Sequence, residues 1–297
     1  MKNKILIIKL GALGDMVQST SAFSALREFH FKDHITLLTT PPYQEFASKM
    51  GYFDEILLDN RLKLSQFRKL LNFGFSLRKE RFYKVYDLQD VDRTKLYSYF
   101  LAKQRNWISF DKEDYLVHPQ DRFRNLFLSL GIPFKPSVDL SHLADSNNLT
   151  LPFPYVLLVP GASLAHNGKK KWPEKNYAEL ALFLLERNIQ PVLLGGPCDH
   201  FDLINRKVSN VIDLSGKTTF YQVIGLAQKA LCTVGNDTGA TLLAASAGCK
   251  TLTLYSKCNP PSLGGARGTQ HIGLYQSHLK DLGVDIVSKA LETFLTL

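Results

Sequence analysis

The sequence predicts an α/β protein built from two doubly wound domains. Short runs of leucine and β-branched residues alternate with amphipathic stretches along the whole chain, which is typical of βαβ units. A segment over 136–154, rich in Ser, Asn, Asp and Pro, separates two halves of similar size and is typical of a linker. We therefore expect domains at residues 1–150 and 151–297, with ligands at the carboxyl ends of strands that face a cleft.

The first half carries five candidate strands, each followed by a helical or polar stretch. The strands are expected at residues 4–10, 34–40, 55–58, 84–90 and 106–110. Helices are expected over 14–29, from Tyr43 onward, from Arg93 onward and over 122–130, where Gly131 and Pro133 stop the last one.

The second half repeats the pattern. Strands are expected at residues 155–163, 190–197, 211–216, 230–236 and 251–256. Helices are expected over 174–187, between the second and third of these strands, up to Lys229, over 238–247 and over 282–295.

Composition indicates a globular protein of a reducing compartment. No run of 18 apolar residues is present, and the opening MKNKILIIKLGALGD is better explained as a first strand than as a signal peptide. The four cysteines lack the spacing of a zinc site, so we expect no structural metal; they are Cys198, Cys232, Cys249 and Cys258. We expect a cytoplasmic protein.

The net charge of +9 is concentrated in one segment. Between Arg61 and Lys84 there are eight basic residues and one acid, Glu80, interleaved with phenylalanine and leucine. This pattern suits an anionic partner such as a phospholipid surface or a phosphorylated glycolipid, and a solvated helix with a basic outer face explains it equally well. Nucleic acid is not expected, since no recognition motif accompanies the charge.

Four strand-to-helix junctions carry unusual residues: GALGD (11–15), PGASLAHNGKKKWP (160–173), LLGGPCDH (193–200) and VGNDTGATLLAASAG (234–248). The last predicts an anion site, because glycine permits close approach of a ligand and the helix start offers unpaired N–H groups beside the Thr238 hydroxyl. An acid, Asp237, is unexpected there unless it caps the helix or orients neighbouring donors. A plain helix cap is the alternative.

Together these junctions resemble glycosyltransferase family 9, the lipopolysaccharide heptosyltransferases. The resemblance spans essentially the whole chain and includes ILIIKLGALGD, YDLQDVDRTKL, KKKWPEKNYAEL, LLGGPCD, IDLSGKTTFYQVIGLAQKA and VGNDTGATLLAA. It implies the GT-B architecture of two Rossmann-like domains facing across a cleft. It also implies metal-independent, inverting transfer of heptose from ADP-heptose to the inner core of lipopolysaccharide, with no cofactor.

The resemblance places the general base at Asp15. An inverting transfer needs a carboxylate near the attacking hydroxyl, and a loop tip after a buried strand would hold one firmly. The competing interpretation is that Asp15 only caps the following helix.

On the donor side, the resemblance assigns the phosphate contact to Lys170, which Lys169 and Lys171 would share or replace. The other donor-binding residues expected are Gly161, Ala162, Ser163, Asp237, Thr238, Gly239 and Ala240. Gly195 and Gly196 would lie near the nucleotide, although a tight turn explains them equally well. Trp172 is expected to be a packing residue rather than a platform for the base.

On the acceptor side, the resemblance implies contacts from Gly14, Arg61, Lys63 and Arg93 to an anionic acceptor such as Kdo–lipid A. Surface solubility is the alternative role of the three basic residues. We expect a monomer that makes peripheral contact with the inner face of the cytoplasmic membrane.

One residue departs from the family pattern. The family carries a histidine on the first turn of the helix after Asp-Thr-Gly, where this chain has Leu242. This keeps open a different nucleotide sugar, or a non-catalytic protein that binds a nucleotide or glycolipid. An epimerase or nucleotide-sugar hydrolase is less supported because the motifs offer few extra acids or histidines. A dinucleotide oxidoreductase is disfavoured because the full G-x-G-x-x-G spacing is missing.

Overall fold

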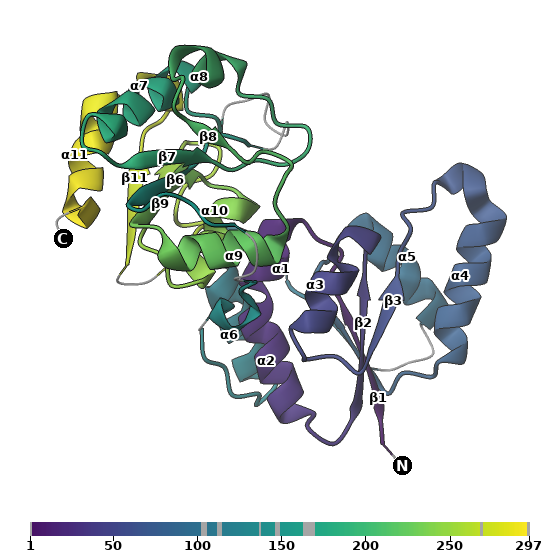
Figure 1. Ribbon diagram of the computed structural model, residues 1–297. Coiled ribbons are helices and arrows are strands. Elements are labelled where there is room, and N and C mark those ends of the chain that lie inside the picture. The colour runs from purple at the N-terminus through teal and green to yellow at the C-terminus, as the bar shows by residue number, and fades with distance from the viewer. Residues whose placement is uncertain are drawn as a thin grey trace. The chain divides into compact units, whose positions relative to one another are not determined.

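The computed structural model describes residues 2–101, 106–111, 115–136, 138–145, 149–162, 170–267 and 270–295. The chain divides into two compact units, Met1–Val138 and Asp139–Leu297 (Figure 1). The division falls inside the polar segment 136–154. Each unit holds one parallel sheet with helices on both faces, which confirms the predicted fold class of two doubly wound α/β domains. Within the described residues, no helix combines the length and apolarity that a membrane span requires.

Unit 1 is built on a five-stranded sheet with the order β3-β2-β1-β4-β5. The strands are β1 (Lys4–Ile8), β2 (His34–Thr39), β3 (Glu55–Leu58), β4 (Lys84–Asp87) and β5 (Trp107–Ile108). All neighbours are parallel, and β1 pairs with both β2 and β4. The chain therefore reverses its direction of travel across the sheet between β1 and β4, where sheets of this class bind their ligands.

Helices cover both faces of this sheet. They are α1 (Leu13–Gln18), α2 (Thr20–Phe29), α3 (Gln44–Lys49), α4 (Phe67–Lys79), α5 (Asp92–Leu101) and α6 (Pro119–Ser129). Figure 1 shows α2 and α6 on one side of the sheet and α4 and α5 on the other. The Ser21 hydroxyl of α2 donates to Gln120 Oε1 of α6 at 2.7 Å, and α4 and α5 pack on the face that carries Leu6 and Ile8.

Two helices of unit 1 differ from the expectation. The helix expected over 14–29 is divided at Ser19, whose hydroxyl donates to the carbonyl of Asp15 at 2.7 Å, a bond that bends helices. The basic segment, for which a helix was one of two interpretations, forms α4 over most of its length.

Unit 2 is built on a six-stranded parallel sheet with the order β11-β10-β9-β6-β7-β8. The strands are β6 (Tyr155–Val159), β7 (Gln190–Leu193), β8 (Ile212–Asp213), β9 (Cys232–Asn236), β10 (Thr251–Tyr255) and β11 (His271–Tyr275). Strand β6 pairs with both β7 and β9, so the reversal lies between β6 and β9. The sequence analysis missed β11, a partly exposed edge strand of weak hydrophobic pattern.

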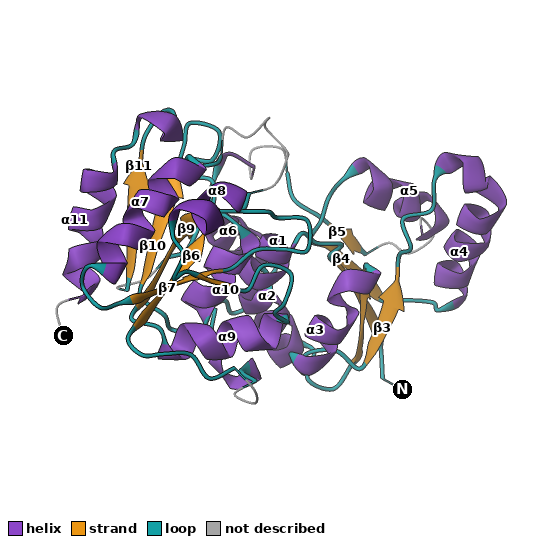
Figure 2. Ribbon diagram, turned by 45° about the horizontal axis from the view of Figure 1, so that its top comes forward, coloured by secondary structure: helices purple, strands orange, loops and turns teal. Residues whose placement is uncertain are grey.

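The helices of unit 2 are α7 (Glu174–Leu185), α8 (Asp202–Lys207), α9 (Phe220–Lys229), α10 (Gly239–Ser246) and α11 (Val284–Leu295). Helices α7, α8 and α11 share a buried apolar cluster with Val156 and Leu158 of β6. Figure 2 shows the strands of both units between their helices. Short 3₁₀ turns occupy Pro41–Tyr43, Leu64–Gln66, Ser141–Leu143 and Leu279–Asp281.

Candidate functional site

A cavity of about 230 Å³ lies at the carboxyl edge of the unit 1 sheet, where the chain reverses between β1 and β4. Asp15 and Gln18 enter it from the segment after β1, and Gln89 and Asp90 enter it from the segment after β4. Its remaining lining is Lys9, Ser19, Leu88, Val91, Phe110, Tyr115, Pro119, Arg122 and Phe123. The acid singled out in the sequence therefore lies where doubly wound sheets bind ligands.

Asp15 also contributes to the start of α1. It occupies the third position of that helix, and its Oδ2 accepts a hydrogen bond from the N–H of Ala12 at 3.0 Å. No hydrogen bond from a described residue reaches Oδ1, and the side chain is exposed. The capping interpretation is thus correct for one oxygen, and it leaves the second oxygen available to a ligand. A carboxylate anchored in this way is held in one orientation.

Gly11 is required by the backbone of the same turn. Its φ of +107° is a conformation that other residues rarely adopt, and a Cβ there would collide with the ring of Tyr43. Tyr43 has a raised pKa because it is half-buried and because the charge of Asp15 opposes its ionisation. Gly14, half-buried in the first turn of α1, directly precedes Asp15.

Two cations that the sequence analysis did not select line the same cavity. Lys9 is buried, and its Nζ donates to the carbonyl of Leu88 at 2.9 Å. Burial lowers the pKa of Lys9, and the nearby charge of Asp15 acts in the opposite direction. The signal for Lys9 was available, since a lysine interrupts the apolar run IIKLG.

The second cation is Arg122 of α6. Its guanidinium lies over the rings of Tyr115 and Phe110, at 4.5 and 5.1 Å from their centroids. Its Nε is buried and forms no hydrogen bond within the described part of the chain. A buried donor without a partner favours an anionic group in the cavity, beside the Asp15 carboxylate.

Arg93, expected to contact the acceptor, is engaged with Asp59. Its Nε and Nη2 donate to the two Asp59 oxygens at 2.5 Å each, and its Nη1 donates to the carbonyl of Leu62 at 3.0 Å. Asp59 is almost fully buried, which raises the pKa of its carboxyl. Hydrogen bonds from Arg93, from Tyr97 and from the N–H of Arg61 outweigh that effect and leave the pKa lowered. This geometry favours a role in which Arg93 holds the segment of Asp59 and Leu62 in place.

The segment that Arg93 supports carries the other two basic residues expected on the acceptor side. Arg61 has a φ of 51°, and its Nη2 donates at 3.3 Å to the carbonyl of Leu10, two residues after the end of β1. Lys63 is exposed two residues later. The structure therefore brings Gly14 and Arg61 to the same edge of the sheet as Asp15, with Lys63 on the adjoining segment.

In unit 2, buried Asn236 joins three of the predicted donor segments at the reversal between β6 and β9. Its Nδ2 donates to the carbonyls of Pro160 and Gly161 at 2.9 and 3.2 Å. Its Oδ1 accepts from the N–H of Trp172 at 3.0 Å, which fixes the chain directly after Lys171. The turn at Gly161, the lysines 170–171 and the Asp237–Ala240 segment are thereby brought together. Sequence reasoning missed Asn236, although it ends a strand inside a quoted motif.

Trp172 is a packing residue, as the sequence analysis expected. Its indole N–H donates to the carbonyl of Leu282 at 2.9 Å, and its ring packs edge-on against Tyr177 with 4.8 Å between centroids. Lys170 is half-buried and Lys171 is exposed. The expected donor residues Ser163 and Lys169 lie outside the described residues.

The start of α10 retains the features of an anion site. Thr238 occupies the cap position, yet its hydroxyl lies 3.3 Å from that of Thr241 and caps no backbone N–H. Asp237 Oδ2 accepts from Asn259 Nδ2 at 3.2 Å, so the segment after β10 orients this acid. Gly239 and Ala240 then begin the helix. Leu242, one turn on, is buried to 8% exposure.

The two glycines after β7 form a tight turn around Asp199. Its Oδ2 accepts from the N–H of Gly196 at 2.8 Å, and a Cβ added at Gly195 would lie 3.0 Å from the Cβ of Asp199. A Cβ added at Gly161 would lie 2.6 Å from the same Oδ2. The turns after β6 and β7 therefore meet at Asp199, beside the Asn236 cluster.

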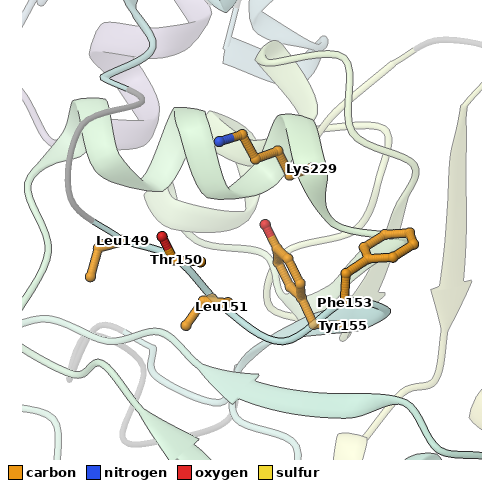
Figure 3. Close-up of a pocket in the computed structure, with 6 residues that line it drawn as sticks. All are labelled: Leu149, Thr150, Leu151, Phe153, Tyr155 and Lys229. Carbon is orange, nitrogen blue, oxygen red and sulfur yellow. The ribbon is translucent and has the colours of Figure 1, made fainter.

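Unit 2 contains a cavity of about 410 Å³, which lies away from these residues. Figure 3 shows Lys229 of α9 near a strip formed by Thr150, Phe153 and Tyr155. Tyr155 is the first residue of β6, so this cavity adjoins the amino end of that strand. Ligands of parallel sheets bind at the carboxyl ends, and none of the expected site residues lines this cavity.

Comparisons with known proteins identify the family. Residues 134–282 match the model of glycosyltransferase family 9 (heptosyltransferase). The chain is 25% identical to lipopolysaccharide heptosyltransferase 2 of Escherichia coli K12, over 86% of this chain and 84% of that protein. It is 24% identical to lipooligosaccharide heptosyltransferase 2 of Haemophilus ducreyi, over 82% and 80% of the two chains.

Solved structures show the same fold. The structure of E. coli ADP-heptose lipopolysaccharide heptosyltransferase II matches with a TM-score of 0.76 at 23% identity, covering 99% of this chain and 98% of that one. A family 9 glycosyltransferase from Veillonella parvula matches with a TM-score of 0.80 at 18% identity, covering 99% and 97%. Since the family model matches half of the sequence and the fold agrees throughout, the chain belongs to glycosyltransferase family 9 and is a glycosyltransferase.

Proposed function

We propose that the chain transfers heptose from ADP-heptose to an anionic inner-core lipopolysaccharide acceptor, Kdo–lipid A or a heptosyl residue, with inversion and without a metal. The names of its relatives, lipopolysaccharide and lipooligosaccharide heptosyltransferases, support the acceptor and the sugar. The observation that carries the proposal is the anchored Asp15 carboxylate, which shares a cavity at the sheet reversal with Lys9 and Arg122.

Asp15 is proposed as the general base. As the acceptor hydroxyl oxygen attacks the anomeric carbon, Oδ1 takes the hydroxyl proton, and the bond from that carbon to the phosphate oxygen breaks on the opposite face. ADP leaves with the electron pair of that bond. The N–H of Ala12 keeps the carboxylate oriented throughout. Lys9 and Arg122 would hold an anionic group of the acceptor beside it.

Unit 2 is proposed to bind the donor. The diphosphate gains negative charge as it leaves, so it needs cations and N–H groups already in place. Lys170 and the first N–H groups of α10 would supply them, with Ser163, Lys169 and Lys171 sharing the contacts. Glycines 161, 195 and 196 would let the nucleotide approach the backbone closely.

The acceptor is proposed to reach unit 1 from a membrane. Arg61 and Lys63 would contact its anionic groups, with Arg93 and Asp59 fixing their segment. We accordingly propose that a monomer works at the inner face of the cytoplasmic membrane. Leu242 supports one alternative, a different nucleotide sugar, because leucine offers no hydrogen bond where the family carries histidine.

The base is tested with Asp15→Asn. The amide oxygen still accepts from Ala12, so the turn should keep its structure, whereas the proton acceptor is lost. We expect kcat to fall by roughly 10²–10⁴-fold, with the rise in melting temperature caused by ADP unchanged. Asp92→Asn is the matched control, since Asp92 also occupies the first turn of a helix and is exposed. Full transfer activity in Asp15→Asn would show that the base is a different residue.

Lys170→Ala separates donor binding from catalysis. It should weaken ADP binding and raise the KM for the donor, with little change in acceptor affinity. A rise in melting temperature with UDP or GDP instead of ADP would move the donor to another nucleotide sugar. The absence of a rise with any nucleotide would favour the non-catalytic alternative.

A further inference from the structure

Helix α4 is held firmly through one face. Leu70, Gly74 and Leu77 are buried and follow the three- and four-residue spacing of a single helix face. A Cβ added at Gly74 would lie 2.5 Å from the ring of Phe100, so the backbone of α4 approaches α5 closely at this point. The opposite face of α4 therefore points away from unit 1 in a fixed orientation.

That outer face is both aromatic and basic. We define the α4 surface by Phe67, Arg68, Phe75, Arg78, Lys79 and Arg81, all of which are exposed. Phe67 and Phe75 expose 59% and 49% of their surface. The Phe75 ring packs edge-on against Phe100 of α5, with 5.9 Å between centroids, and about half of the side chain stays exposed. Single exposed rings are common on proteins, and two exposed rings on one basic helix are a feature of interaction surfaces.

The positive charge of the α4 surface is not neutralised within unit 1. None of Arg68, Arg78, Lys79 and Arg81 forms an ion pair with another described residue. Glu80, the one acid between Arg61 and Lys84, pairs instead with Lys4 at 2.7 Å. An anionic partner would supply the complementary charge.

The surface also has a suitable shape. Asn72, Phe75, Arg78, Lys79 and Arg81 line a hollow of about 710 Å³ on the outside of α4. Because an aromatic ring and three cations line it, the hollow suits phosphate headgroups above an apolar layer. An interfacial helix has the same composition, with basic residues beside large apolar ones.

We propose that the α4 surface docks unit 1 on an anionic phospholipid bilayer. Arg68, Arg78, Lys79 and Arg81 bind the lipid phosphates, and the rings of Phe67 and Phe75 enter the interface beneath them. The inference rests on the proposed function for its purpose, since an acceptor carried by a glycolipid is reached from the membrane. Nucleic acid is less favoured, because no recognition motif accompanies the charge.

Vesicle sedimentation of the full chain tests the proposal. The wild-type protein should bind vesicles of phosphatidylcholine mixed with phosphatidylglycerol, should not bind phosphatidylcholine alone, and should bind less as salt is raised. Each cation near the surface is worth about fivefold in affinity, so the pair Arg78→Ala and Lys79→Ala should weaken binding by roughly 25-fold. Phe75→Ser should weaken it by about tenfold through loss of the inserted ring.

The matched control is Phe31→Ser combined with Lys32→Ala. Phe31 is 69% exposed and its ring lies beside Lys32, so the control removes an aromatic and a basic side chain from another part of unit 1. It should bind vesicles as the wild type does. ADP binding and transfer to a deacylated, water-soluble acceptor require no vesicle. They report on the proposed function separately and should be unchanged in the α4 variants.

Three results would overturn the proposal. The first is that the wild type does not bind the phosphatidylglycerol vesicles. The second is equal binding by the wild type and Phe75→Ser, which would leave a purely electrostatic contact without insertion. The third is displacement from the vesicles by a single-stranded RNA oligonucleotide whose binding also depends on Phe75, which would assign the surface to nucleic acid.

Discussion

At the scale of single residues, buried polar side chains hold the segments of the candidate site in place, and the proposed base is exposed. Asn236 and Asp59 are almost completely buried, and each joins segments that are distant in the sequence. Asp15 and Lys171, by contrast, are exposed. A buried hydrogen-bonding group that loses its partner lowers the free energy of unfolding by about 1–3 kcal/mol. Asn236 and Asp59 therefore keep the segments that they join in fixed positions. The geometry of the candidate site thus depends on residues that would not touch a substrate.

We therefore expect Asn236→Ala to affect both stability and donor binding. It leaves the N–H of Trp172 and the carbonyls of Pro160 and Gly161 without their buried partner, which should lower the free energy of unfolding by about 2–3 kcal/mol. ADP affinity should fall as well, because the Gly161 turn and Lys170 lose their common anchor. Denaturant unfolding and ADP titration measure the two effects.

Asn205→Ala provides the comparison. Asn205 is exposed and its amide group donates to Asp213, so its loss should change stability by less than about 0.5 kcal/mol. If Asn236→Ala behaved like Asn205→Ala, the three segments would be held by other contacts, and Asn236 would not be their anchor.

The position of a site residue could be predicted from the sequence only where the residue lies within a recognisable motif. GALGD and VGNDTG indicate loops at strand ends, because glycine directly before a helix start favours a tight turn over a continued strand, and both lie at sheet reversals. Asp59 and Arg122 could not be selected as site residues from the sequence in the same way. Whether a given acid or arginine becomes buried depends on strands and helices far along the chain, such as the pairing of Asp59 with Arg93.

At the scale of elements, the alternation of strands and helices was predictable and the ends of elements were not. The strand expected over 84–90 ends at Asp87 because the Asp87 side chain accepts from the N–H groups of Gln89 and Asp90 at 3.1 and 2.9 Å. Such a turn replaces the sheet ladder with local bonds. It also bends the chain so that Gln89 and Asp90 line the cavity with Asp15.

Gly74 shows how packing overrides helix propensity. In an exposed helix interior, Gly→Ala gains up to about 1 kcal/mol. At Gly74 the added methyl would lie 2.5–2.6 Å from the Phe100 ring, so α4 or Phe100 must move. We expect Gly74→Ala to destabilise the protein by about 1–2 kcal/mol, since overpacking outweighs the propensity gain. Thermal unfolding of the full chain measures the change.

Ser76→Ala is the control on the same helix, because Ser76 is exposed and its hydroxyl bonds within α4, to the carbonyl of Phe73. It should be neutral or slightly stabilising. A stabilised Gly74→Ala protein would mean that α4 is loosely packed on α5, and the fixed orientation of the α4 surface would then be wrong.

At the scale of the whole molecule, two units repeat one architecture with different chemistry at the same place. In each sheet the strand order reverses beside the first strand of that sheet. Glycine-rich turns follow the strands at this point. Unit 1 places a carboxylate and two cations at that edge, which suits proton removal from an anionic acceptor. Unit 2 places a helix start and Lys170 there, which suits a diphosphate. The sequence supports the same proposed division between acceptor and donor binding, since the acid and the lysines lie in different halves of the chain.

If the division is correct, ADP should stabilise unit 2 and leave unit 1 nearly unchanged. A ligand that binds only the folded state stabilises it by about 2.7 kcal/mol at one hundred times its dissociation constant. Hydrogen exchange of the full chain, with and without ADP, should therefore show slowed exchange in peptides that hold the ends of β6 and β9 and the start of α10. Peptides of β1 and β4 should exchange as before, and Lys170→Ala should remove the effect at the same ADP concentration. Protection centred on the Asp15 cavity instead would move the nucleotide site to unit 1 and exclude the proposed roles of both units.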